Sequence, residues 1–129
     1  LKNGLLPDGG NGSIDGTNSF PILFSALAKS TAASSFGYPA AGKYTGADLV
    51  YSSGAISFDT SNGNLTYALP SDMTGGCSGG PWLSAMATTS PYSGTLSSVN
   101  SYKYGTTTYI YGPKFNSYTN DTYVVAKAA

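Results

Sequence analysis

The chain has 129 residues and a mass of 13.2 kDa, which fits one domain. Its six Lys and six Asp cancel, only 9% of residues are charged, and Arg, Glu and His are absent. This composition excludes a basic surface for nucleic acid or an anionic membrane, and it leaves zinc without its usual ligands. We therefore predict no metal, no cofactor, and neither a nucleic-acid nor a membrane partner. The lack of His also means that His-assisted catalysis cannot come from this chain alone.

The remaining composition indicates a β-rich domain. Hydrophobic residues make up 40% of the chain and aromatic residues 13%, including 11 Tyr, so a sizeable core can form. Enrichment in Gly, Ser, Thr and Tyr is typical of secreted proteins, and a single Cys excludes an internal disulfide. From this composition we expect the protein to act outside the cell. The first residue is Leu1, so we also expect the chain to be a processed piece of a longer precursor.

The first half of the chain alternates between loop and strand signals. Leu1–Ser19 is rich in Gly, Asn and Asp and predicts an exposed loop or an ordered tail. Phe20–Lys29 fits a strand or a helical turn, and Ser30–Ser35 predicts a loop. Three elements then form a predicted hairpin: a strand within Asp48–Phe58, a turn at Asp59–Gly63 and a partner strand at Leu65–Leu69.

The second half predicts a glycine-dense loop followed by three strands. The loop is Asp72–Gly80, and Tyr123–Ala129 could form a short terminal helix. The strand candidates are Pro81–Ala87, Thr95–Tyr104 and Thr106–Tyr111. Strands at roughly 8–12-residue spacing predict an all-β barrel or sandwich.

One loop has a pattern suited to chemistry. Gly76–Pro81 reads G-C-S-G-G-P, and glycines on both sides of Ser78 allow backbone conformations closed to other residues. Such a loop can present a hydroxyl beside two main-chain N–H groups, as acyl transfer requires. The alternative is an ordinary Gly-Ser turn. An α/β-hydrolase elbow is rejected, because Pro81 follows where a helix should start and no His exists.

Thr74–Trp82, reading T-G-G-C-S-G-G-P-W, resembles the nucleophile loop of chymotrypsin/trypsin-like serine proteases. It is most similar to the branch of bacterial glutamyl endopeptidases and related microbial trypsin-like peptidases. Phe36–Ala40 resembles the G-Y-P segment of that branch, and Val99–Tyr102 resembles its substrate-binding strand. The resemblance implies the C-terminal, six-stranded antiparallel β-barrel of a two-barrel protease.

The resemblance also assigns roles at the nucleophile. Ser78 is expected to attack the substrate, with the N–H groups of Gly76 and Ser78 as the oxyanion hole. Ser101 and Tyr102 are expected to pair with or line the substrate. Lys103 replaces a more usual Gly and is expected to narrow the mouth of the pocket.

Two residues compete as determinants of specificity. Asp72, six residues before Ser78, matches the position that selects basic side chains in trypsin, although it could equally cap a local turn. Thr74 is the rival, since glutamyl-specific relatives also have a Thr four residues before the nucleophile. Protein or peptide substrates follow in either case.

Cys77 replaces the Asp that precedes the nucleophile in trypsin, so activation by a newly freed N-terminus is not expected. We expect an inert, buried thiol, with a disulfide to another chain as the alternative. Many relatives have a disulfide near this loop, and Ser52 or Ser53 and Ser71 stand where its cysteines are expected.

The His and Asp of the triad precede the nucleophile by more residues than this chain offers. We therefore expect residues 1–35 to be the interdomain connection and the start of the second barrel, and residues 36–129 to be the nucleophile-bearing barrel. A companion chain from the same precursor would supply the His and Asp. The alternatives are an inert pseudo-protease or binding barrel, and a carbohydrate-binding domain that stacks sugars on Tyr. Sequons at Asn11, Asn64 and Asn120 fall in predicted loops or turns and permit N-glycosylation in a eukaryote.

Overall fold

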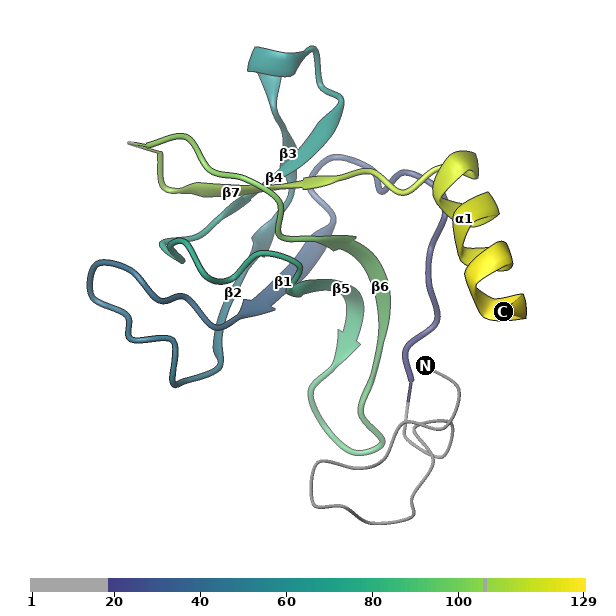
Figure 1. Ribbon diagram of the computed structural model, residues 1–129, viewed down its shortest axis with the longest axis horizontal. Coiled ribbons are helices and arrows are strands. Elements are labelled where there is room, and N and C mark those ends of the chain that lie inside the picture. The colour runs from purple at the N-terminus through teal and green to yellow at the C-terminus, as the bar shows by residue number, and fades with distance from the viewer. Residues whose placement is uncertain (1–18, 106) are drawn as a thin grey trace.

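A computed structural model describes residues 19–105 and 107–129, which form two antiparallel sheets and one terminal helix (Figure 1). The four-stranded sheet has the order β2-β1-β5-β6 and the three-stranded sheet the order β3-β4-β7. The prediction of an all-β domain with a short terminal helix is confirmed. The prediction for Leu1–Ser19 lies, except for Ser19, outside the described residues.

Strand β1, Ala32–Gly37, lies between β2 and β5 and corrects the expectation of a loop at Ser30–Ser35. Its Ala-Ala-Ser-Ser sequence has little strand propensity of its own. Ala33 is 5% exposed and Ser35 is fully buried, so small side chains here allow close packing beneath the sheet. The strand is therefore fixed by its two neighbours rather than by its own sequence.

The predicted strand within Asp48–Phe58 is divided into β2, Val50–Ala55, and β3, Ser57–Phe58. Ile56 lies between them, is 1% exposed, and donates its backbone N–H to Thr31 at 2.9 Å. The chain passes here from one sheet to the other. The described residues form seven strands, where the resemblance implied six. This division leaves the predicted all-β architecture intact.

The predicted hairpin is confirmed, with β4 at Thr66–Pro70 pairing with β3. The turn between them is a 3₁₀ helix, Thr60–Asn62, and the Asp59 side chain accepts a hydrogen bond from the Ser61 N–H at 2.9 Å. Gly63 ends the turn in a left-handed conformation at φ 74°, which suits glycine.

Strand β5 has the predicted bounds, Pro81–Ala87, whereas its two successors are shifted. Strand β6 is Ser93–Val99, and beyond it only Tyr102 bridges to Tyr111. Strand β7 is Tyr109–Pro113, because the Thr107 N–H instead closes a turn on the Tyr104 carbonyl at 3.2 Å. For Phe20–Lys29, the structure has one bridge, from Ile22 to Leu96, and no longer strand or helix.

The core lies between the two sheets. Its largest fully buried side chains are Trp82, Tyr67, Ile56, Leu69 and Met73. The Trp82 and Tyr67 rings lie 6.3 Å apart, and Met73 belongs to the loop after β4. The glycine-dense loop is therefore anchored in the core through its own side chain.

Helix α1, Ser117–Ala128, begins six residues before the predicted terminal helix. Asn116 and Thr119 form a reciprocal capping box at its start, a signal that a pattern search for Glu or Gln at that position misses. Figure 1 shows the helix to one side of the sheets, and it has no buried residue. Within the described residues, no helix has the length and apolar character to cross a membrane.

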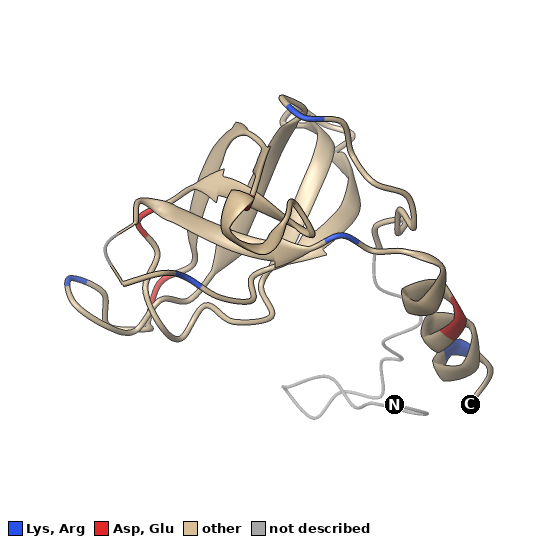
Figure 2. Ribbon diagram, turned by 90° about the horizontal axis from the view of Figure 1, so that it is seen from above, with Lys and Arg blue, Asp and Glu red and all other residues tan. Residues whose placement is uncertain are grey.

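Charged residues are few in the described part of the chain and are spread along the ribbon, as Figure 2 shows. The distribution of charge therefore does not mark a site, and local geometry must locate it.

The domain boundary expected between residues 35 and 36 falls inside β1 and stays a prediction.

Candidate active site

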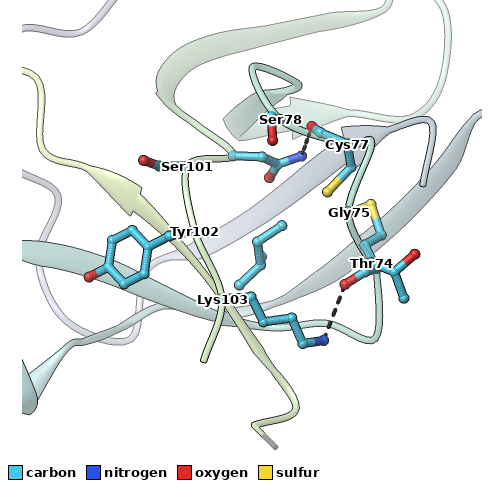
Figure 3. A pocket seen from close by; sticks show the side chains of 10 residues that line it. Thr74, Gly75, Cys77, Ser78, Ser101, Tyr102 and Lys103 are labelled. Carbon is cyan, nitrogen blue, oxygen red and sulfur yellow. Dashed lines mark hydrogen bonds between the residues drawn. The ribbon is translucent and has the colours of Figure 1, made fainter. Parts of the chain in front are cut away.

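The predicted nucleophile lies at an open cavity formed by the loop between β4 and β5 and by the segment after β6 (Figure 3). The cavity has a volume of about 270 Å³. The predicted residues that line it are Thr74, Ser78, Ser101, Tyr102 and Lys103. Met73, Gly75, Cys77, Asn100 and Ile110 complete the lining. The fold thus gathers most of the predicted site residues around one cavity.

Ser78 is exposed, and none of the described residues forms a hydrogen bond with its hydroxyl. Gly79, which follows it, has φ 79° and donates its N–H to the Asn100 carbonyl at 2.8 Å. The backbone of the loop is therefore held in place, whereas the Ser78 hydroxyl remains available to react.

Gly76 occupies a backbone position that only glycine fits. Its φ is 104°, and an added Cβ would lie 2.9 Å from both the Cβ and the backbone nitrogen of Ala40. The carbonyl just before it, that of Gly75, accepts a hydrogen bond from the Ala40 N–H at 2.7 Å. In a trans peptide the C=O and N–H point in opposite directions, so this bond turns the Gly76 N–H away from Ala40.

The peptide between Cys77 and Ser78 is held in the same way. The Cys77 carbonyl accepts hydrogen bonds from the Asn100 Nδ2 at 3.0 Å and from the Gly80 N–H at 3.1 Å. Neither the Gly76 N–H nor the Ser78 N–H donates to any described residue. Two fixed, unpaired N–H groups beside an exposed hydroxyl are the components that stabilise a developing oxyanion.

Asp72, by contrast, does not line the cavity. Its carboxylate accepts hydrogen bonds from Lys43, with which it also forms an ion pair, and from the Tyr44 hydroxyl at 2.7 Å. Hydrogen bonding to Lys43 and then to Tyr44 lowers the pKa of Asp72 below its ordinary value. The structure thus places this carboxylate at the surface, 56% exposed, facing the loop that carries Lys43.

Thr74 lines the cavity, but its hydroxyl is engaged elsewhere. It donates to the Ala41 carbonyl at 2.8 Å and accepts from the Ala41 N–H at 3.1 Å. This pair of bonds fastens the nucleophile loop to the segment after β1. The hydroxyl must give up one of these bonds before it can bind a substrate.

Lys103 supplies the only charged side chain among the residues that line the cavity. Its Nζ donates to the carbonyl of Met73 at 3.1 Å and to that of Ser71 at 3.2 Å. The side chain crosses toward the nucleophile loop in Figure 3. Lys103 therefore brings a positive charge to the lining of the cavity, and its narrowing of the pocket mouth stays a prediction.

The neighbours of Lys103 on either side are anchored to one buried carboxylate. The hydroxyls of Tyr102 and Tyr104 donate to Asp59 at 2.6 and 2.8 Å, and Asp59 is 3% exposed. Burial raises the pKa of Asp59, but the hydrogen bonds from Tyr102, Tyr104 and Ser61 outweigh burial and hold this pKa below its ordinary value. The pKa of Tyr104 rises to about 12, chiefly through its bond to Asp59. These contacts fix the backbone that presents Lys103.

Cys77 is a free thiol, 6% exposed, as the sequence predicted for a buried cysteine. Burial raises its pKa, although the ammonium of Lys103 opposes the shift, so a reactive thiolate is not favoured. Ser52 donates to the Ser71 hydroxyl at 2.9 Å, so these two side chains face each other, and the correspondence with a disulfide of relatives stays a prediction. Ser53 instead forms a hydrogen bond with Ser34.

The sequons have different surroundings. Asn11 lies outside the described residues, and Asn64 is exposed at the end of the turn before β4. Asn120 lies in helix α1, which corrects the expectation of a loop.

Within residues 19–105 and 107–129, no group of three or more His, Cys, Asp or Glu side chains could hold a metal ion.

Sequence reasoning missed two residues that organise this site. Asn100 was noticed only within the strand-like Val99–Tyr102 stretch, yet it joins β1, the nucleophile loop and β5. Asp59 was predicted only as a turn residue, a role it fills alongside its bonds to two tyrosines. The side chains that bond to the Asn100 amide, and the two tyrosines that bond to Asp59, lie more than 15 residues away in the chain, so no local pattern reveals these contacts.

The structure was also compared with known proteins. No family model and no curated protein matches the chain. Solved structures do match, and two of them are proteases. A thermostable serine protease, AL20, from an extremophilic microorganism is 33% identical with a TM-score of 0.75, and protease Anisep from Arthrobacter nicotinovorans is 39% identical with a TM-score of 0.76.

The matches cover 87% and 86% of this chain. The chain has the fold of one trypsin-like serine protease domain. It spans only 50% and 49% of the two solved chains, which is about half of each. The Ser78 loop of this domain lies at the cavity described above.

Proposed function

We propose that the chain is the C-terminal, nucleophile-bearing half of a trypsin-like serine endopeptidase, related to the microbial glutamyl-endopeptidase-like branch. Ser78 attacks the substrate carbonyl, and the N–H groups of Gly76 and Ser78 stabilise the oxyanion. A companion chain from the same precursor supplies the triad His and Asp. The substrates are proteins or peptides, and the assembly acts outside the cell.

The single observation that carries this proposal is the pair of tethered peptides around Cys77. Each has its carbonyl bonded from behind, the Gly75 carbonyl by Ala40 and the Cys77 carbonyl by Asn100. The N–H of each peptide, that of Gly76 and that of Ser78, donates to none of the described residues and lies beside the exposed Ser78 side chain. An ordinary Gly-Ser turn does not require two carbonyls held by hydrogen bonds beside two N–H groups that have no partner among the described residues.

The side chains that this chain lacks support the proposal of a companion. None of the 129 residues is His, and a serine hydroxyl is a weak nucleophile without an adjacent base. Helix α1 leaves Tyr118, Val124 and Val125 exposed by 80%, 55% and 72%. An apolar surface of this kind suits contact with a second polypeptide.

Reaction with a fluorophosphonate, followed by peptide mapping, tests the proposal. We expect the natively purified assembly to be labelled at Ser78, whereas this chain refolded alone stays unlabelled because it lacks a base. Separation of the labelled sample by mass should give a second polypeptide beside the 13.2 kDa chain. Absence of both label and second polypeptide in the native sample would identify the chain as an inert or binding barrel.

The cavity further supports a preference for acidic over basic substrate side chains. Its only charged lining residue is Lys103, whose ammonium has two carbonyl partners and three hydrogens. The third hydrogen can donate to a substrate carboxylate, and a substrate ammonium would meet a like charge. Asp72, the alternative determinant, is occupied by Lys43 and Tyr44 outside the cavity.

We expect Lys103→Met to remove this preference. The native assembly should cleave after Glu at least about tenfold better than after Gln, with Lys the poorest, since a charge-assisted hydrogen bond is roughly twice as strong as a neutral one. In Lys103→Met the Glu-to-Gln ratio of kcat/KM should fall to near one. Lys43→Met, which removes a surface cation near Asp72, is the matched control and should keep the ratio. Preferred cleavage after Lys in the native assembly would reverse the assignment.

A further inference from the structure

We infer that Asn100 is a positioning residue for the oxyanion hole, acting on the Ser78 N–H through the Cys77 carbonyl. The inference rests on the proposed function and extends it to a residue that does not contact substrate. Asn100 is 2% exposed and lies directly after β6.

The orientation of the Asn100 amide is determined by its four partners. The Oδ1 accepts from the Trp82 Nε1 and from the Ser35 hydroxyl, each at 2.6 Å. The Nδ2 donates to the Phe36 carbonyl at 2.9 Å and to the Cys77 carbonyl at 3.0 Å. A reversed amide would place its NH₂ against the Trp82 indole N–H, which can only donate, and its oxygen against two carbonyls, so one orientation alone satisfies all four partners.

This orientation sets the direction of the Ser78 N–H. The Cys77 carbonyl and the Ser78 N–H belong to one planar peptide and point in opposite directions. Because the Asn100 Nδ2, together with the Gly80 N–H at 3.1 Å, holds the carbonyl on the buried side, the Ser78 N–H points to the other side, where the exposed Ser78 side chain lies. Donation to the carbonyl also polarises the peptide and strengthens its N–H as a donor.

The backbone of Asn100 secures the same loop a second time. Its carbonyl accepts from the Gly79 N–H and its N–H donates to the Gly80 carbonyl, both at 2.8 Å. These two bonds do not depend on the side chain, so a side-chain variant keeps the loop attached to the strand. A replacement of the amide can therefore alter the peptide's direction without releasing the loop.

Asn100→Asp tests the inference in the native assembly with its companion. The aspartate keeps the size and an acceptor for Trp82 and Ser35, but it loses both amide donors. We expect kcat to fall by about 10–100-fold with KM within about twofold, somewhat less than the loss of an oxyanion donor itself. The affinity for a peptide aldehyde, whose adduct places an oxygen in the hole, should fall by the same factor as kcat/KM.

Ser35→Ala is the matched control, because it removes one bond from the other side of the same amide and leaves the Cys77 contact in place. It should lower thermal stability while kcat and aldehyde affinity stay within about threefold of the native values. If Asn100→Asp does not fold, Asn100→Ser replaces it, because its shorter hydroxyl cannot span to the Cys77 carbonyl.

The outcomes separate the two proposals. Failure of the native assembly to react with fluorophosphonate at Ser78 would overturn the proposed function and this inference with it. A reactive native assembly in which the Asn100 variant loses only stability, as Ser35→Ala does, would overturn the positioning role alone. Parallel losses of kcat and aldehyde affinity at constant KM would support it.

Discussion

Replacing Ser78 by alanine is expected to lower the kcat/KM of the native assembly on the order of 10⁵-fold, close to complete loss of hydrolysis. The hydroxyl supplies the attacking atom, and the variant keeps only the residual rate from substrate binding and the oxyanion hole. Peptide hydrolysis and fluorophosphonate labelling of the same preparation measure the effect. Circular dichroism should be unchanged, since Ser78 is exposed and its side chain has no partner among the described residues.

Two variants make this result specific to Ser78. Ser101→Ala removes another hydroxyl from the same cavity and should change kcat/KM by less than about tenfold, because Ser101 is expected to pair with or line the substrate and not to attack it. Cys77→Ser removes the adjacent thiol and should retain most of the activity, since burial raises the pKa of Cys77 and disfavours its thiolate. Hydrolysis that persists in Ser78→Ala but disappears in Cys77→Ser would make the thiol the nucleophile.

Elements with a strong local signal were predictable from sequence. Strand β5 has its predicted bounds, because Trp82 and Leu83 are bulky, apolar and buried and follow Pro81. The hairpin of β3 and β4 was also predictable, since Asp59 and Gly63 suit the start and end of its tight turn. In both places the local preference agrees with the tertiary structure.

Elements that depend on distant partners were not predictable. Strand β1 forms because β2 and β5 bond to both of its edges, while its small residues carry no strand signal. The role of Asn100 was not predictable for the same reason, because its contacts with Ser35 and Phe36 span 65 and 64 residues. The position of Ser78 in a loop followed from its glycines, but the groups that orient its peptide could not be read from local sequence.

Packing determines which charged side chain lines the cavity, as Asp72 and Lys103 illustrate. The resemblance to trypsin makes Asp72, six residues before Ser78, one of two candidates for the residue that selects the substrate side chain, with Thr74 as the other. The segment after β1 brings Lys43 and Tyr44 to that carboxylate, whereas Asp59 anchors the tyrosines beside Lys103. The sign of the charge in the cavity therefore depends on two long-range contacts rather than on the motif.

The glycine whose replacement should damage the fold most is Gly80, at the end of the nucleophile loop. A Cβ on Gly80 would lie 1.9 Å from the Phe36 carbonyl oxygen, 2.8 Å from the Asn100 Nδ2 and 3.0 Å from the Cys77 carbonyl oxygen. Two of these three atoms are backbone and cannot turn away, so strand β1 or the loop itself must move. Its own N–H and carbonyl are bonded to Cys77 and Asn100 and would be displaced with it.

We therefore expect Gly80→Ala to destabilise the domain by at least about 4 kcal/mol, a large part of the roughly 5–15 kcal/mol that holds such a domain folded. Urea unfolding followed by Trp82 fluorescence measures the change, because this buried indole bonds to Asn100 beside the clash. Gly75→Ala is the matched control in the same loop: nothing lies within 4 Å of its added Cβ, so stability should change by no more than about 1 kcal/mol. Equal stability of the two variants would mean that the loop does not pack closely against β1, and the tethering of the Ser78 peptide by Asn100 would lose its structural basis.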